Sequence, residues 1–465
     1  MMEYENLKSE LLSSVDTGLK YARTKDSKVE FELYLFYQRI SKANIKQGVV
    51  EATDGIIEGN AVRASEKNRV SFASSSGISI DRIKRSINEA VASSKSVSIK
   101  DTRFKGFCEP KKPGKEGIFA SEILNLGKEQ LINYAKGLVK DGLGFHNKIL
   151  MAEANCEAEW GGFAIGNTLG LQQASRSALN NCYVYCMAKD KEERRVGYEF
   201  DISRKSLIKT EGMGEKAAQK AINLLGARKL GEATVLPTVW KPIAAASYFY
   251  ASLGQSTRGQ PVVEKRSPLT DKINEQIANL NLTVIDDGQK PTGIMTDAVD
   301  AEGYPQQKNV IVDKGRLKQF MFDTYYARIY GTESTGNCSR GGGPFGATLP
   351  YETSPTISPR SIEISTGNKN IDNLIASIDG QAILITDAPI GIFHSNVSTG
   401  EFSVVAGSVF LIQNGTKKWP LQPVSVSGNF YKGFEKLLEL GNDLTTTPFA
   451  IETPSLVFDG FSIVG

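Results

Sequence analysis

The chain has 465 residues, of which 40% are hydrophobic and 23% are charged, and its formal net charge is +3. A chain of this length exceeds what one typical compact core contains, so we expect two domains. The small net charge argues against a nucleic-acid partner, because proteins that follow a phosphate backbone usually carry a large basic excess on one face.

The N-terminal sequence MMEYENLKSELL is polar and acidic, unlike the basic and then apolar start of a signal peptide. No uninterrupted apolar run approaches the length that spans a bilayer. We therefore expect a cytoplasmic protein without a membrane partner. Five cysteines are too few for a disulfide framework, and the spacing of Cys182 and Cys186 places both thiols on one face of a strand, as small buried hydrophobic groups.

The first 230 residues predict an α+β domain in which helices pack on a largely antiparallel sheet (1–230). In KVEFELYLFYQR, apolar and polar residues alternate, which predicts a half-buried strand with Phe31 and Leu33 inside and with Glu32 and Tyr34 on the opposite face. We expect further strands at about 41–52, 56–64, 70–74, 148–165 and 169–188, helices at 4–23, 79–96, 128–140 and 213–225, and a connector at 105–117.

From Thr234 onward, the expected helices are short, and Gly, Pro, Ser and Thr separate many short strands. This pattern predicts a β-rich C-terminal domain, a barrel-like sheet or a sandwich (231–465), with the boundary between Leu225 and Thr238. The clearest strands are expected at 309–313, 362–365, 382–386, 402–413 and 423–426.

A glycine run in NCSRGGGPFG is the first candidate functional segment. Glycines allow close backbone approach and positive φ, so the segment is either a surface loop or a loop that lines a substrate cleft along an extended peptide. Cys338 as a nucleophile needs a base, and His146 and His394 are the two histidines of the chain. The candidate cleft residues here are Cys338, Arg340, Gly341, Gly342 and Gly343.

A second candidate segment, FHSNVSTGEFSVV, crowds polar residues around a turn before a strand. It is either a hairpin turn with polar side chains or a cleft wall that hydrogen-bonds a peptide backbone. The candidates are His394, Asn396, Thr399 and Glu401. A third cluster consists of carboxylates, for which turn and cap chemistry is the simplest explanation because their spacing does not match a calcium-binding loop (Asp286, Asp287, Asp297, Asp300 and Glu302).

Several runs in the second half resemble the TldD/PmbA family in order and spacing from about residue 226 to residue 444. They are GARKLGEATVLPTVWKPIAAA, LTVIDDGQKPTGIMTDAVDAEGYPQQKNVIVDKGRLKQFMFDTYYAR, HSNVSTGEFSVVAGSVFLIQNG and VSVSGNFYKGFEKLLELGNDL. The resemblance implies an α+β N-terminal domain, a β-rich C-terminal domain and cytosolic proteolysis of small or unfolded peptides by a TldD–TldE heterodimer.

In the zinc-bearing branch of that family, a helix carries His-Glu-x-x-x-His and a C-terminal cysteine also ligates the metal. The same helix here reads IAAASYFYASLGQSTRGQ, with Tyr248, Phe249, Tyr250 and Leu253, and the segment TTTPFAIETP contains no cysteine. The resemblance therefore implies a TldE/PmbA-like subunit without a cofactor of its own, with zinc held by a TldD-type partner.

Peptide is the expected substrate of that heterodimer, and whether the chain forms a homodimer without its partner stays open. Two alternatives to the helper-subunit hypothesis remain from the sequence. One is an independent hydrolase with a Cys or Ser nucleophile, and the other is a non-enzymatic peptide-binding regulatory module.

Overall fold

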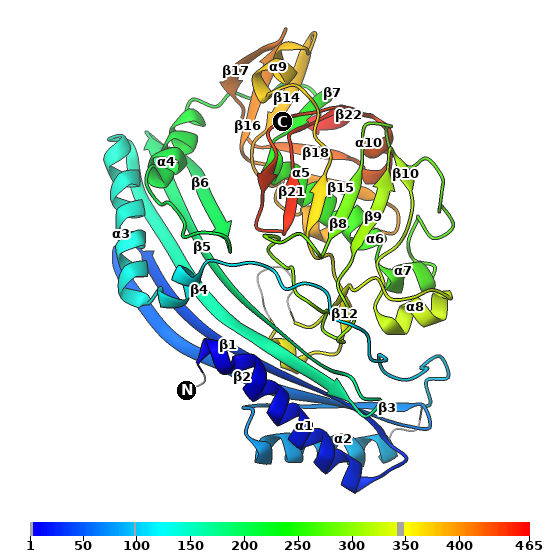
Figure 1. Cartoon of the computed structure of the whole chain (residues 1–465). Coiled ribbons are helices and arrows are strands. Elements are labelled where there is room, and N and C mark those ends of the chain that lie inside the picture. The colour runs from blue at the N-terminus through cyan, green and yellow to red at the C-terminus, as the bar shows by residue number, and fades with distance from the viewer. Residues whose placement is uncertain (1–2, 97–98, 342–347) are drawn as a thin grey trace.

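A computed structural model of the chain describes residues 3–96, 99–341 and 348–465. A long, curved sheet forms the N-terminal part, and its strands bend around a compact β-rich C-terminal part (Figure 1). The last helix of the N-terminal part, α4, ends at Asn223, and the first strand of the C-terminal part, β7, begins at Thr234. The α+β fold class predicted from the sequence is confirmed.

The N-terminal sheet is antiparallel throughout, in the order β3-β2-β1-β4-β5-β6. The separate strand expected at 41–52 is wrong, because β1 continues to Lys46 and the chain turns at Gln47 and Gly48, both with positive φ. The strands are β1 (Glu30–Lys46), β2 (Val49–Glu66), β3 (Arg69–Ser76), β4 (Ile149–Asn167), β5 (Gln172–Asp190) and β6 (Glu193–Ser203).

Four helices cover one face of this sheet in two separate groups. Near one end, α1 (Leu7–Lys25) and α2 (Ile80–Ser96) bury their apolar stripes against β1 and β2. Near the other end, α3 (Lys128–Phe145) and α4 (Met213–Asn223) pack on β4 and β5 (Figure 1). The buried thiols of Cys182 and Cys186 belong to this second group, as the sequence predicted. Two short 3₁₀ turns occupy Tyr4–Asn6 (η1) and Ser121–Asn125 (η2).

The C-terminal part buries one end of the opposite face of β1, which corrects the half-buried strand predicted for that end, whereas the same face is half-exposed farther along the strand. Glu32 and Tyr34 are 1% and 3% exposed, because the C-terminal part covers this end of the face. Tyr34 belongs to a hydrophobic cluster that also contains Tyr304 and Cys338. A period-2 pattern shows which residues share a face, but it does not show that a second domain covers the polar one.

The C-terminal part contains two large sheets and a two-stranded ladder. The first sheet has the order β15-β18-β22-β7-β14-β16-β17, with β19 paired to β22, and the second has the order β10-β9-β8-β13-β21-β20. The single strand expected at 402–413 is two strands that are not neighbours in the sheet. The strands are β7 (Thr234–Trp240), β8 (Val284–Asp287), β9 (Lys308–Asp313), β10 (Arg316–Leu317), β11 (Cys338–Ser339), β12 (Thr356–Ile357), β13 (Ile362–Ile364), β14 (Gln381–Ile385), β15 (Glu401–Ala406), β16 (Val409–Gln413), β17 (Thr416–Pro420), β18 (Val424–Asn429), β19 (Leu437–Leu440), β20 (Thr445–Thr446), β21 (Ile451–Thr453) and β22 (Leu456–Val464).

One large hydrophobic core lies between these sheets and encloses α5 (Pro242–Ala251), which contributes Ala244 to Phe249 as buried side chains. The other helices of this part are short. They are α6 (Leu253–Ser256), α7 (Gly259–Val263), α8 (Thr324–Tyr330), α9 (Ile371–Ala376) and α10 (Phe430–Glu435), with 3₁₀ turns at Pro350–Glu352 (η3) and Ile392–His394 (η4).

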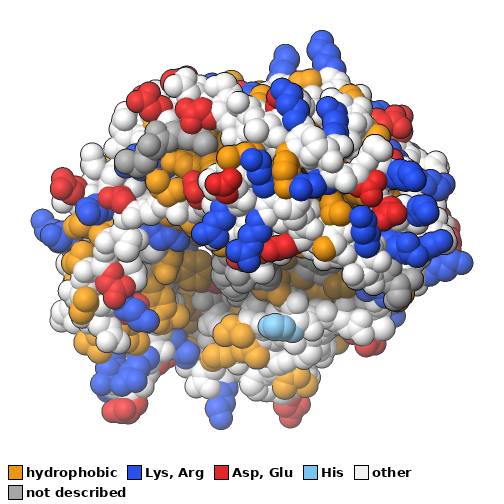
Figure 2. Space-filling model, turned by 90° about the horizontal axis from the view of Figure 1, so that it is seen from below, with side chains coloured by type: hydrophobic (Ala, Val, Ile, Leu, Met, Phe, Trp, Pro, Cys, Tyr) orange, Lys and Arg blue, Asp and Glu red, His pale blue; other side chains and the backbone are white. Residues whose placement is uncertain are grey.

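Seen from below, the surface carries Lys and Arg interspersed with Asp and Glu, and a hollow with hydrophobic side chains crosses its middle (Figure 2). No helix in the described part of the chain combines the length and the apolar character that crossing a membrane requires.

Candidate functional site

Helix α5 begins with Pro242 at its first turn, where the missing N–H of proline removes no hydrogen bond. Tyr248 lies in the middle of the C-terminal core, and its Oη donates a 2.8 Å hydrogen bond to the carbonyl oxygen of Phe430. The Tyr248 ring lies 4.9 Å from the Phe430 ring and 5.0 Å from the Phe458 ring, between centroids. Tyr248 is therefore a packing residue whose one polar atom is satisfied inside the protein.

The neighbouring residues of this helix also serve packing. The Phe249 ring lies 5.2 Å from the Phe434 ring, between centroids, and is tilted against it by 36°. Leu253, which follows a break in the helix at Ser252, is buried. The helical segment expected at 243–260 is thus three short helices. Neither phenylalanine nor leucine has an atom that ligates zinc, so α5 does not fit a metal site. Among residues 3–96, 99–341 and 348–465, no group of three or more His, Cys, Asp or Glu side chains is arranged to hold a metal ion.

Tyr250 lies on the more exposed side of α5 and forms an aromatic triangle with Phe393 and Phe449. The ring centroids are 5.6 Å apart for Tyr250 and Phe393, 5.7 Å for Tyr250 and Phe449, and 5.5 Å for Phe393 and Phe449. The triangle joins α5 to the TTTPFAIETP segment and to η4, whose last residue is the exposed His394. The segments that the resemblance associates with a metal site are therefore neighbours in space, and aromatic rings fill the space between them.

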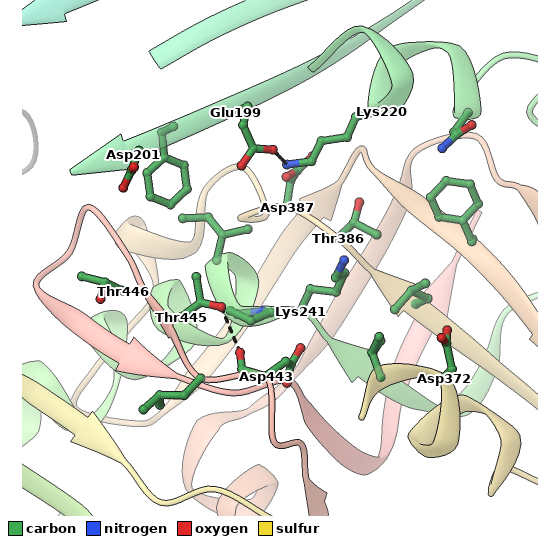
Figure 3. A pocket seen from close by; sticks show the side chains of 18 of the residues that line it. Glu199, Asp201, Lys220, Lys241, Asp372, Thr386, Asp387, Asp443, Thr445 and Thr446 are labelled. Carbon is green, nitrogen blue, oxygen red and sulfur yellow. Dashed lines mark hydrogen bonds and ion pairs between the residues drawn. The ribbon is translucent and has the colours of Figure 1, made fainter. Parts of the chain in front are cut away.

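A cavity of about 1080 Å³ lies between the two parts of the molecule. One wall consists of β6 and α4, and the opposite walls consist of the start of α5, the end of β14, α9 and residues 443–446, which include β20 (Figure 3). Lys241 and Pro242 at the start of α5 line the cavity together with Thr445 and Thr446. The same two segments that meet in the aromatic triangle therefore also border this cavity.

Charged side chains of both signs face the cavity. Lys220 of α4 forms a 2.9 Å ion pair with Glu199 of β6, and Lys241 extends from another wall (Figure 3). Asp387 is buried between them, and no hydrogen-bond partner for its Oδ1 atom exists in the described structure. Burial raises the pKa of Asp387, and the charges of Lys220 and Lys241 oppose this effect. These groups can bind polar or charged ends of a ligand.

Strand β6 is the edge of the N-terminal sheet, since β5 is the one strand that pairs with it in the described part of the chain. Its last five residues, 199–203, line the cavity. An edge strand presents backbone N–H and C=O groups that are available to another extended chain. The cavity thus combines charged side chains with a strand edge, on which the Ile202 N–H already donates to Asp201 Oδ1 and the Tyr198 carbonyl accepts from Lys220 Nζ.

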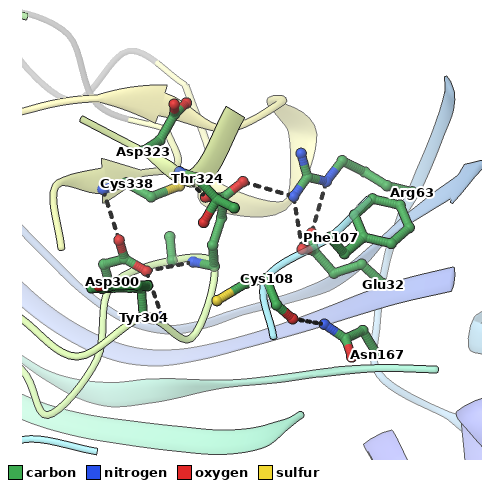
Figure 4. Close-up of polar contacts among 12 residues, drawn as sticks. Glu32, Arg63, Phe107, Cys108, Asn167, Asp300, Tyr304, Asp323, Thr324 and Cys338 are labelled. Atoms are coloured by element: carbon green, nitrogen blue, oxygen red, sulfur yellow. Dashed lines mark hydrogen bonds and ion pairs between the residues drawn. The ribbon is translucent and has the colours of Figure 1, made fainter. Parts of the chain in front are cut away.

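The first predicted loop lies elsewhere, at the contact between the two parts (Figure 4). Cys338 is fully buried, and burial together with Glu302 and Asp300 raises the pKa of its thiol. Arg340 is also buried and donates a 2.6 Å hydrogen bond to Glu32 of β1. Gly341 has a φ of +67°, as a glycine turn allows. Gly342 and Gly343 lie outside the described residues.

The same contact contains a network of buried charges. Arg63 of β2 donates to both carboxylate oxygens of Glu32, at 2.8 and 2.7 Å, and to Glu302 at 2.9 Å. Asp300 accepts hydrogen bonds from the backbone N–H groups of Glu302, Tyr304 and Cys338. Turn chemistry therefore explains Asp300 as expected, whereas Glu302 belongs to an ion-pair network inside the molecule.

The second predicted segment forms an exposed turn. Asn396 Oδ1 accepts from the N–H groups of Ser398 and Thr399, and the side chains of His394, Asn396, Thr399 and Glu401 are exposed. The following strand, β15, is an edge strand, but Ile390 pairs with Val405, and the Asn396 N–H donates to the Glu401 oxygen. Part of this edge is thus already occupied. The proposed role of these residues in a cleft stays a prediction.

None of the residues predicted for a cleft lines the 1080 Å³ cavity. The cavity residues that sequence reasoning missed come from β6, α4, α5 and the end of β14, with Glu199, Lys220, Lys241 and Asp387 as the charged examples. Among these residues, only the Lys241-Pro242 pair carries a local sequence signal, because it marks where helix α5 begins. The other cavity residues come together only because the N-terminal and C-terminal parts of the molecule dock.

Family models agree with this architecture. Residues 122–225 match the PmbA/TldA metallopeptidase central domain, and residues 233–465 match the PmbA/TldA metallopeptidase C-terminal domain. The chain belongs to the PmbA/TldD family. The predicted family is thereby confirmed.

Relatives within the PmbA/TldD family are distant but extend over most of the chain. An uncharacterised protein of Methanocaldococcus jannaschii is 26% identical, covering 87% of this chain and 89% of its own. A metalloprotease TldD homolog of Buchnera aphidicola is 24% identical, covering 90% of this chain and 88% of its own. The crystal structure of TldE from Thermococcus kodakarensis superposes with a TM-score of 0.86 at 23% identity, covering 97% of this chain and all of that one, and shows that the two share a fold.

Proposed function

We propose that this chain is the non-zinc subunit of a TldD/TldE-type metallopeptidase that degrades or processes small or unfolded peptides. The observation that carries the proposal is α5, in which Tyr248 and Phe249 pack into the core where the family motif places metal ligands. A Lewis acid and a general base are therefore expected from the partner, a TldD-type paralogue with zinc. This chain would shape and hold the substrate.

The compartment proposed for this complex is the cytoplasm. All five cysteines of the chain are free and buried. Free thiols in these numbers suit a reducing compartment, where disulfides are rare.

We propose further that β6 is the segment that holds an extended peptide. An added strand forms main-chain hydrogen bonds that do not depend on the peptide sequence, as a peptidase for unfolded substrates requires. The cavity gives such a strand room beside 199–203, and Lys220, Lys241 and Asp387 offer contacts for its polar groups. The segment FHSNVSTGEFSVV, predicted as a possible cleft wall, offers less free edge, because Ile390 and Asn396 already pair with part of β15.

The test of the subunit role is reconstitution. The purified chain, its TldD-type paralogue and their mixture are assayed for cleavage of an unstructured peptide, with and without a chelator. We expect chelator-sensitive cleavage to be much faster in the mixture than in either protein alone. Metal analysis of the same samples should find zinc in the paralogue and in the complex. Full activity or stoichiometric zinc in the isolated chain would contradict the proposal.

Strand addition has its own test, which uses the peptide rather than the protein. A peptide methylated on every backbone nitrogen keeps its side chains but cannot donate hydrogen bonds to a strand edge. We expect it to bind the chain at least about tenfold more weakly than the unmodified peptide, which corresponds to a loss of about 1.4 kcal/mol. Equal binding of the two peptides would mean that side chains, not the β6 edge, hold the substrate.

The structure does not favour the hydrolase alternative based on Cys338. Its thiol is fully buried, and its pKa is raised, whereas a nucleophilic cysteine needs access and a lowered pKa. The regulatory-module alternative is supported instead if the chain binds peptides and the mixture with the paralogue shows no turnover.

A further inference from the structure

Two strand edges border the 1080 Å³ cavity, and each part of the molecule supplies one of them. Strand β6 is the edge of the N-terminal sheet. Strand β20 is the edge of the second C-terminal sheet, where β21 is the one strand that pairs with it in the described part of the chain. Asp201 of β6 and Thr446 of β20 lie on opposite walls of the cavity (Figure 3). The two edges therefore open onto the same space.

The pairing of β6 shows which of its residues turn their backbone toward the cavity. In an antiparallel ladder, every second residue turns both its N–H and its C=O toward the neighbouring strand, and the residues between turn theirs away. The Tyr198 carbonyl accepts from Lys220 Nζ at 2.9 Å. The Ile202 N–H donates to Asp201 Oδ1 at 2.8 Å. Both residues thus turn away from β5, and so does Phe200 between them, for whose N–H and C=O no hydrogen bond outside the β5–β6 ladder occurs among the described residues.

The same reasoning applies to β20. The Thr447 N–H donates to the Ile451 carbonyl at 3.0 Å, so Thr447 turns toward β21. Thr446, which lies opposite Glu452 in the ladder, then turns its N–H and C=O away from β21. Thr446 lines the cavity, and its outward groups have no hydrogen-bond partner in the part of the chain that the structure describes. Phe200 and Thr446 therefore each present one donor and one acceptor to the cavity.

An extended chain matches two such edges at once. Its successive residues turn their backbone groups to opposite sides, so one residue can pair with Phe200 and the next with Thr446. Free strand edges are normally protected by charged side chains, proline, bulges or a covering segment. Here Lys220 and Asp201 occupy groups on either side of Phe200 but leave its own N–H and C=O free. The cavity volume is at the upper end of the range for ligand pockets, which suits a segment of several residues.

We propose that a substrate peptide binds as a bridging strand, hydrogen-bonded to β6 on one side and to β20 on the other. The inference rests on the proposed function, in which β6 holds an extended peptide, and it adds β20 as the second edge. The ligand class is any extended peptide segment with an unmodified backbone. Such a strand joins the N-terminal and C-terminal parts of the molecule through main-chain hydrogen bonds, which do not depend on the peptide sequence.

Amide-to-ester replacement in the peptide tests the two sides separately, because an ester oxygen replaces the N–H without adding bulk. A short peptide of repeated alanine carries esters at the odd positions in one version and at the even positions in another, and calorimetry measures binding to the full chain. We expect each version to bind about fivefold more weakly than the unmodified peptide, since each loses the donors to one edge. A peptide held by a single edge keeps its donors in one version, and the repeated sequence lets it shift by one residue without changing a side-chain contact.

A variant of β20 locates the second edge. Thr446→Pro removes the N–H that faces the cavity but no bond of the ladder with β21, a position at which edge strands tolerate proline. We expect it to weaken binding of the unmodified peptide about fivefold and to keep the melting temperature of the wild type. Thr446→Val is the matched control, because it changes the side chain and keeps the backbone donor, and it should bind like the wild type.

Several results would overturn the bridging strand. They are the absence of binding by the unmodified peptide, weaker binding of one ester version or of neither, and undiminished binding by a folded Thr446→Pro protein. If Thr446→Pro does not fold, the two ester versions decide. Strand addition to β6 alone survives if the fully methylated peptide still binds more weakly while at most one ester version does. None of these measurements uses peptidase activity, so the subunit proposal is tested separately.

Discussion

Arg340 of the C-terminal part and Glu32 of β1 form a fully buried ion pair, with 2.6 Å between Nη2 and Oε1. The two residues are 308 positions apart in the sequence. Arg63 binds the same carboxylate and extends the network to Glu302. A buried ion-pair network therefore joins the two parts of the molecule. Removing one of its charges should lower the stability of the whole fold.

Glu32→Gln should reduce the free energy of unfolding by about 3 kcal/mol or more, because it leaves the guanidinium groups of Arg63 and Arg340 without their shared counter-charge. Denaturant unfolding measures the change. Glu89→Gln removes an exposed partner of Arg85 on α2 and should change little. A Glu32→Gln protein as stable as the Glu89→Gln protein would mean that this network contributes nothing to stability.

Tyr248→Phe removes one hydrogen bond and leaves the packing of the ring in place. We expect a loss of about 1 kcal/mol in the free energy of unfolding, since the carbonyl oxygen of Phe430 loses its donor. Tyr183→Phe, at an exposed position of β5, is the control and should have a smaller effect. Tyr248→His, which restores a family-type ligand at one position, should destabilise the core without creating tight zinc binding, as thermal denaturation with and without zinc would reveal.

The acidic cluster at the contact should make stability depend on pH. Burial raises the pKa of Asp300 to about 7, and burial with the charge of Glu302 raises the pKa of Asp323. Between about pH 4 and pH 7 the folded chain keeps protons that the unfolded chain has released. The contribution of these groups is therefore complete at low pH and is lost as the pH rises through their folded pKa values.

Asp323→Asn tests this dependence. An asparagine can still cap α8 by accepting from the N–H of Tyr326, but it does not titrate. The decline of stability between pH 5 and pH 8 should become shallower, by up to about 1.4 kcal/mol per pH unit. Asp372→Asn, on exposed α9, should keep the wild-type slope. A slope that Asp323→Asn leaves unchanged would show that Asp323 does not titrate in this range.

The cysteines should not react in the folded protein. All five are buried, and burial raises the pKa of Cys108, Cys186 and Cys338. We expect a thiol-alkylating reagent to modify the native chain slowly and the unfolded chain at all five positions, as mass spectrometry would record. Cys338→Ala should retain partner-dependent peptidase activity. Rapid native alkylation with loss of activity would revive the nucleophile hypothesis.

Local sequence patterns predicted most of the helices and strands. They did not predict burial that arises from contacts between segments far apart in the sequence. Amphipathic spacing found α1 and α2 within a few residues, because a helix on a sheet always buries one stripe. The burial of Glu32 could not be predicted, since one of its two counter-charges, Arg340, lies 308 positions away in the C-terminal part. For the same reason no local pattern indicated that Cys338 and Arg340 are buried, and their role in a cleft stays a prediction.

The sequence by itself determined the family and the absence of ligating side chains in α5, because both depend on the order of residue types. The tertiary structure alone decided that β6, α4, α5 and residues 443–446 line one cavity between the two parts. This cavity lies where the N-terminal and C-terminal parts of the molecule meet. How the two parts dock depends on buried ion pairs and on complementary surfaces, and a local sequence pattern does not show either of them.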